Sequence, residues 1–290
     1  MRPRSSMKVA EVALLIMVFD LCWWYLATMF SGRMLVILTH VCMLAVGTLG
    51  ILFSGTKLME YGIIPRNLLW SLKWGLYLAL SVCIPAFLFM AVMILLGKAP
   101  VNLKEASIGK VLATLAFCMV VYSPEEFFFR GYVQSRLNEV FGTPFSRIPG
   151  FKGEIRYGLS AILTGIVFGL NHVFNYINPL TGMYQLDAGV VRNIAIACFV
   201  GIFLGFLREK SGDIICPLIF HGLQDFAIAF IWNLTTGSVM FIGLAIGWLV
   251  FLAKPFKKFL QSRADQVGTP SNILPTESPS STSLAWSTKG

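Results

Sequence analysis

The sequence predicts an all-α, polytopic membrane protein with about eight transmembrane helices. Of the 290 residues, 56% are hydrophobic and only 13% are charged, about half the ~25% typical of a soluble domain. The mean hydropathy is +0.74. A spanning helix needs about 20 mostly apolar residues, so a chain of this length has room for about eight. The composition excludes a disordered chain, a coiled coil and an ordinary soluble enzyme.

Polar breaks divide the chain into eight apolar stretches. The first follows three basic residues, is too long for a signal peptide and precedes no small-residue cleavage site, which indicates a signal anchor. The tail at 261–290 is rich in Ser, Thr and Pro and is expected to be disordered. Residues 1–260 therefore form the expected membrane domain, with predicted spans at 11–30, 34–54, 74–96, 108–130, 159–178, 190–207, 213–233 and 237–253.

The basic residues predict how these spans are oriented. The chain has 23 Lys and Arg against 14 Asp and Glu. With eight spans, 18 of the 23 fall on the side of the N-terminus and 5 on the other side. Cytoplasmic loops carry such an excess, so both termini are expected in the cytoplasm. The positive charge then needs no nucleic-acid partner. The six cysteines stand singly in apolar runs and predict neither a disulfide framework nor a metal cluster.

Ionisable residues inside the spans are the candidates for function. Each costs at least ~2.5–3.5 kcal/mol at mid-bilayer on insertion scales, so such residues face one another or water. All three histidines of the chain are among them. The set is Asp20, His40, Glu125, Glu126, Arg130, His172, His221 and Asp225. Asp20 and His40 are interpreted as a hydrogen-bonded link between the first two helices, or as lining a water-filled cavity.

The densest cluster runs from Ser123 to Arg130. Glu126 and Arg130 are four residues apart on a helix and are expected to pair, whereas Glu125 points about 100° away and stays free. Pro124 predicts a kink. The spacing of Ser123 and Glu126 also matches a capping box, so a new half-helix is expected to begin within the span. The alternative is a cytoplasmic helix start with a surface ion pair.

Two further elements carry histidines. His172 follows Phe168 in a span with small residues at Gly165 and Gly169, which allow close helix approach. Taken alone, His172 reads as an interior histidine. His221 and Asp225 share a helical face and, taken alone, could be a hydrogen-bonded tie between helices or a functional pair.

Together these elements resemble the CPBP family of intramembrane proteases, which includes the CAAX prenyl protease 2 and the Abi, bacteriocin-processing types. The matching motifs are EExxxR at Glu125, Glu126 and Arg130, FxxxH ending at His172, and HxxxN/D at His221 and Asp225. The resemblance covers about residues 108–233. It implies an intramembrane endopeptidase with a site that opens to the cytoplasm. The implied substrate is a peptide or protein that can be lipidated, in contact with the bilayer.

Amide hydrolysis needs a base, oxyanion donors and an acid for the leaving amine. Glu125 is the natural base, His172 can hold the same water, and His221 can donate to the oxyanion. The resemblance implies the same allocation, with Arg130 and Glu126 as support. Asp225 stands where many relatives have Asn, and an ionised aspartate cannot donate. Asp225 is therefore expected to orient His221, or to be protonated.

Other interpretations remain open. Glu125, His172, His221 and Asp225 could form an N/O zinc site with an open position for water, although no HExxH motif is present and the resemblance favours a glutamate mechanism without a cofactor. A non-catalytic binding or immunity module could keep the same motifs. A proton-coupled transporter is less favoured, because the internal repeat expected of one is missing from the sequence.

Overall fold

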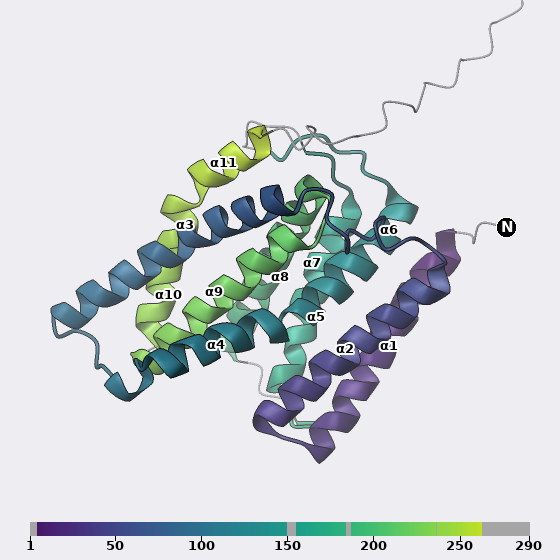
Figure 1. The fold of residues 1–290 in the computed structure, drawn as a ribbon. Coiled ribbons are helices and arrows are strands. Elements are labelled where there is room, and N and C mark those ends of the chain that lie inside the picture. The colour runs from purple at the N-terminus through teal and green to yellow at the C-terminus, as the bar shows by residue number, and fades with distance from the viewer. Residues whose placement is uncertain (1–4, 150–154, 184–186, 236, 263–290) are drawn as a thin grey trace, which may run out of the picture.

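The computed structural model describes residues 5–149, 155–183, 187–235 and 237–262. The described chain is a bundle of helices without a regular β-strand, which confirms the all-α prediction (Figure 1). Nearly all of the tail expected to be disordered lies outside the described residues. The helices before the candidate site are α1 (Ser5–Met29), α2 (Gly32–Ser54), α3 (Leu68–Leu95) and η1 (Leu103–Glu105).

The fourth helical run carries the first motif. Its consecutive elements are α4 (Ile108–Val121), α5 (Ser123–Glu125), η2 (Glu126–Val133) and α6 (Gln134–Phe141). The chain continues through α7 (Leu159–Asn171), η3 (His172–Tyr176), α8 (Ala188–Ser211), α9 (Ile215–Leu234), α10 (Gly237–Ile246), η4 (Gly247–Phe251) and α11 (Ala253–Gln261).

These helices have the lengths and composition of membrane spans. Within the described residues, seven are long and apolar enough to cross a bilayer. An eighth span would be the pair Ser238–Phe251 and Ala253–Gln261, whose two parts meet at a bend of 45°. The polytopic membrane fold that the hydropathy pattern predicts is therefore confirmed. The fourth run is longer than expected, since it extends from Ile108 to Phe141.

Two apolar cores lie on either side of the first motif. The larger core joins α3, α8, α9, α10 and α11 around Leu78, Leu204 and Phe220, which are fully buried. The smaller core joins α1 and α2 to η2 around Phe128 and Tyr132. The charged residues of η2 are thus enclosed by apolar packing that keeps them from lipid.

Small residues bring α7 and α8 into close contact, as the sequence predicts. A Cβ added at Gly165 would collide with the backbone of Ile202, and one at Gly169 would collide with Cys198. On the facing helix, a Cβ at Gly201 would lie 2.7 Å from the carbonyl oxygen of Gly165. Close approach of this kind replaces the hydrophobic driving force that is missing between helices in lipid. It fixes the position of α7, and with it His172.

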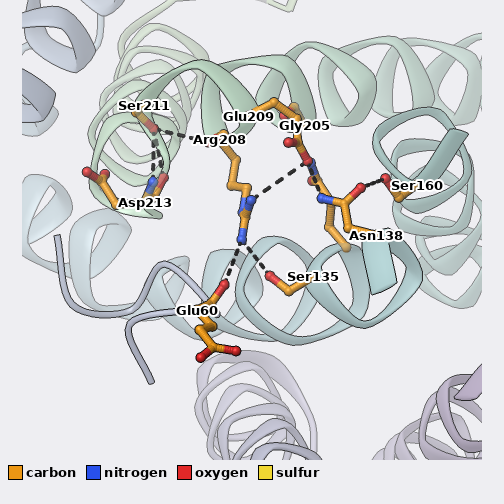
Figure 2. A network of polar contacts seen from close by, with 10 residues as sticks. Glu60, Ser135, Asn138, Ser160, Gly205, Arg208, Glu209, Ser211 and Asp213 are labelled. Carbon is orange, nitrogen blue, oxygen red and sulfur yellow. Dashed lines mark hydrogen bonds and ion pairs between the residues drawn. The ribbon is translucent and has the colours of Figure 1, made fainter. Parts of the chain in front are cut away.

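Polar contacts tie the helices together at one end of the bundle (Figure 2). Arg208 of α8 lies at the centre, where its Nη2 donates to Ser135 Oγ over 2.6 Å and to the Glu60 carbonyl over 3.5 Å. Beside it, Asn138 of α6 donates to Glu209 over 2.7 Å and receives a bond from Ser160 of α7. These contacts join the loop after α2 to α6, α7 and α8, so they hold the end of the bundle that includes the start of α7.

A new helical segment begins at Ser123, as predicted, after a break at Tyr122, but the capping box does not form, because no side chain caps this segment. The Ser123 hydroxyl turns back to the Met119 carbonyl oxygen at 2.6 Å, and the Val120 carbonyl oxygen lies 3.2 Å away. Pro124 has no N–H for Val120, so the hydroxyl approaches a carbonyl that the proline leaves without its usual partner. The chain instead widens into a π-helix at Glu126–Val133. π-Helical turns are rare and frequently occur at functional sites.

Candidate functional site

Glu126 and Arg130 form the predicted ion pair, and both are fully buried. Glu126 Oε2 lies 3.5 Å from Arg130 Nε. The guanidinium also donates through Nη2 to the Gly201 carbonyl at 3.1 Å and stacks over the Phe168 ring at 4.4 Å. A buried charge is tolerated only when it is paired and hydrogen-bonded. Arg130 thus joins η2 to both α7 and α8.

His221 lies between carboxylates from two different helices. Its Nδ1 is 2.8 Å from Glu126 Oε1, and its Nε2 is 3.3 Å from Asp225 Oδ2. The same Nε2 lies 3.9 Å from Glu125 Oε2. Tyr122 and Phe168 pack against the ring, with centroids at 5.4 and 5.7 Å. Both nitrogens of His221 therefore face acceptor oxygens.

His172 uses one of its two ring nitrogens, Nδ1, for a hydrogen bond within its own helical run. Its Nδ1 is 2.9 Å from the Phe168 carbonyl oxygen. A carbonyl only accepts, so Nδ1 carries a hydrogen, and a neutral His172 has its acceptor at Nε2. The ring packs edge-on against Phe168 with centroids 4.8 Å apart. This fixes the tautomer in the form that can accept a hydrogen bond from a water or a substrate N–H.

A small cavity brings Glu125 and His172 together. Its volume is about 90 Å³, and its walls come from α1, α2, Glu125, α7 and η3. Glu125 Oε2 is buried and has no hydrogen-bond partner among the described groups. A buried carboxylate oxygen normally finds a partner in protein or water, and a polar cavity of this size can hold water. His221 and Asp225, in contrast, are not among the lining residues.

The cavity includes residues that the sequence reasoning did not place there. His40, for which a cavity-lining position was one of two interpretations, does line it, and its Nε2 is 3.0 Å from Glu125 Oε1. The expected bond between His40 and Asp20 does not form, since the other His40 nitrogen bonds the Val36 carbonyl. Asn171 and Asn175 also line the cavity. The signal for His40 was present in the sequence, because an ionisable residue inside a span requires a partner.

The cavity lies in one half of the bundle. It is bordered by Trp23 near the end of α1, by Thr39 and His40 in the first half of α2, and by η3 beyond the end of α7. Figure 1 shows the α1–α2 turn at the opposite end of the bundle from the N-terminus. Toward the N-terminal end, the fully buried rings of Phe128, Tyr132 and Tyr61 stack in sequence at 6.2 Å spacings. These rings separate the cavity from that end.

The donor set does not match a metal centre. Within the described ranges, no three His, Cys, Asp or Glu side chains are grouped so that they could hold a metal ion. Of the zinc ligands considered from the sequence, Glu125 and His172 line the cavity, whereas His221 and Asp225 pair with each other at 3.3 Å and do not line it. No step of the reaction below is routed through a metal.

A known protein family matches this region of the chain. Residues 107–227 match the model of the type II CAAX prenyl endopeptidase Rce1-like family. No curated protein matches the sequence significantly. The matched segment begins at α4, ends within α9 and contains all three motifs. The family resemblance expected from Glu125, Glu126, Arg130, His172, His221 and Asp225 is confirmed, and it supports a membrane-embedded endopeptidase.

Proposed function

We propose that the protein is an intramembrane endopeptidase in which Glu125 activates a water molecule. One observation carries the proposal: Glu125 and His172 line the same cavity, and Glu125 Oε2 is buried with no hydrogen-bond partner among the described groups. A general base must be within reach of the proton that it takes. The family match to CAAX prenyl endopeptidases favours a peptide with a prenylated C-terminal motif as the substrate class.

The reaction would proceed in two steps. Glu125 Oε2 takes a proton from water while the water oxygen attacks the carbonyl carbon, and the carbonyl electron pair moves to its oxygen. The tetrahedral intermediate then collapses, the C–N bond breaks, and the proton on Glu125 passes to the leaving amine. His172 Nε2 can accept a hydrogen bond from the attacking water and so orient it.

His221 is the proposed donor to the oxyanion. Its Nε2 lies 3.9 Å from Glu125 Oε2 and 3.3 Å from Asp225 Oδ2, which is a longer contact than the 2.8 Å between Nδ1 and Glu126 Oε1. The buried carboxylate of Glu126 holds Nδ1. The Nε2–H therefore remains as the donor to the negative charge that develops on the substrate carbonyl oxygen. Asp225 is proposed to orient the ring as an ionised acceptor.

The direction from which substrate enters depends on the topology. If the N-terminus is in the cytoplasm, the half of the bundle that holds the cavity faces away from the cytoplasm. With that orientation, an opening in this half of the bundle would lie opposite the cytoplasmic side that the sequence leads us to expect. The excess of basic residues favours the inward N-terminus, and we propose access from the opposite side.

A peptidase assay tests the proposed function. Purified wild-type protein and Glu125→Gln would be given a fluorogenic peptide that ends in a farnesylated CAAX sequence. We expect cleavage by the wild type and a loss of at least about 100-fold in kcat for Glu125→Gln, within the range that general acid–base catalysis contributes. Glu105→Gln is the matched control, because Glu105 pairs with Lys110 on the surface. Equal rates for all three proteins would contradict the proposal.

A further inference from the structure

His40 is the one ionisable residue of the cavity that belongs to none of the three motifs. It lies on α2, 85 positions before its partner Glu125. The two side chains are largely enclosed, each with 12% of its surface exposed. The ring is also held edge-on by Tyr122, with centroids 6.0 Å apart. The position of His40 is thus fixed by its helix, by Tyr122 and by Glu125.

The hydrogen bonds of His40 determine how many protons the pair holds. Nδ1 is 2.6 Å from the Val36 carbonyl oxygen, which can only accept, so Nδ1 carries a hydrogen. Nε2 is 3.0 Å from Glu125 Oε1. If Nε2 carried no hydrogen and Glu125 were ionised, two hydrogen-bond acceptors would face each other. One additional proton must therefore lie between His40 and Glu125.

The charge balance of the buried cluster places that proton on His40. The carboxylates of the cluster are Glu125, Glu126 and Asp225. Arg130 supplies one positive charge, and His221, with carboxylates at both nitrogens, supplies a second when it is protonated. A protonated His40 supplies the third, so that three negative charges meet three positive charges. Charges removed from water are stable only in such compensated groups.

We propose that His40 is a positioning residue, an imidazolium that holds Glu125 through Oε1, balances its charge, and leaves Oε2 without a hydrogen bond beside the cavity. The proposal rests on the proposed function of Glu125 as the base. In this arrangement each oxygen of Glu125 has a separate task. Oε1 is fixed to α2, and Oε2 remains the oxygen without a hydrogen-bond partner among the described groups, which we assign to proton transfer.

Kinetics of three variants test the positioning role, with the farnesylated CAAX peptide as the probe. His40→Leu should lower kcat by about 10–100-fold, as expected for a misplaced catalytic group, and leave KM within about twofold because substrate contacts are unchanged. His40→Gln should recover part of kcat, because its amide can donate to Oε1. Thr48→Val, on the same helix and bonded only to its own backbone at Leu44, should match the wild type.

The proton itself can be observed without turnover. The chain has only three histidines, so ¹⁵N-histidine labelling with single replacements assigns each ring. Both nitrogens of His40 should show imidazolium shifts in the wild type and change to those of a neutral ring in Glu125→Gln. A neutral His40 ring in the wild type would overturn the proposal.

The outcomes separate this inference from the proposed function. An inactive Glu125→Gln together with a fully active His40→Leu would refute the role of His40 and retain the base. A fully active Glu125→Gln would refute the base itself.

Discussion

Glu126 Oε1 and His221 Nδ1 lie 2.8 Å apart in the interior of the bundle, where Glu126 is fully buried. The same glutamate meets Arg130 through its other oxygen. One carboxylate therefore links α9, through its histidine, to the guanidinium that bonds α8. A change at any of these three residues alters the electrostatic surroundings of the other two.

Removal of Arg130 should destabilise the protein. Arg130→Met leaves the buried Glu126 with one cationic partner fewer, and breaking a buried pair typically costs about 3–5 kcal/mol. We expect a lower folded yield and a lower midpoint of thermal unfolding, measured by tryptophan fluorescence in detergent. Lys110→Met removes the exposed pair with Glu105 and should cost less than about 1 kcal/mol. An Arg130 variant as stable as the Lys110 variant would contradict the role of support.

Asp225→Asn should slow turnover. Asparagine can still accept from the ring N–H of His221, but it no longer stabilises a charged imidazolium. By analogy with other carboxylate–histidine pairs, kcat should fall while substrate binding is retained. Steady-state kinetics with the farnesylated peptide would measure both. An unchanged or raised kcat would instead favour a protonated Asp225 that donates to the oxyanion.

Chelation should leave the activity intact. The proposed reaction uses the carboxylate of Glu125 as base and requires no metal ion. Initial rates would be compared before and after dialysis against 1,10-phenanthroline, with the zinc content of both samples determined by atomic emission. Reversible inactivation that zinc alone restores would establish the zinc alternative and refute the metal-independent base.

Packing of α7 against α8 should be sensitive to a single methyl group. Gly165→Ala places a Cβ against the backbone of Ile202, and overpacking of this kind typically costs about 1–3 kcal/mol. Because His172 follows α7, the activity should fall as well. Gly109→Ala is the matched control, since nothing lies within 4 Å of its added Cβ. Thermal unfolding and peptidase rates of the two variants should therefore differ.

The topology has a direct test. Single cysteines at Lys57 and Thr143 should be labelled by an impermeant maleimide from the cytoplasmic side only, and one at Val101 from the opposite side only. The chain's own cysteines would first be replaced by serine or alanine. Labelling of Thr143→Cys from the outside would refute the inward N-terminus and would place the half of the bundle that holds the cavity on the cytoplasmic side.

The spans were predictable because twenty consecutive apolar residues have few alternatives to a membrane helix. The pairing of Glu126 with Arg130 followed from helical spacing, and the meeting of the three motifs followed from the cost of isolated charges in lipid. The partner of His40 was not predictable from spacing, because it lies on a distant helix. The capping box failed because the Glu126 N–H that it requires donates to the Tyr122 carbonyl, while the Ser123 hydroxyl donates to the Met119 carbonyl.

The π-helix at Glu126–Val133 sets the rotation of the helix before it relative to the helix after it in the fourth span. Glu125 directly precedes this segment, and α6, which follows it, is fastened to α1, where Glu139 meets Lys8 at 2.7 Å. A π-helix closes its hydrogen bonds one residue later than an α-helix. Loss of one residue from this segment would rotate one end against the other by about 100°. The number of residues in this segment is therefore as important for the geometry of the site as the identity of the residues that form it.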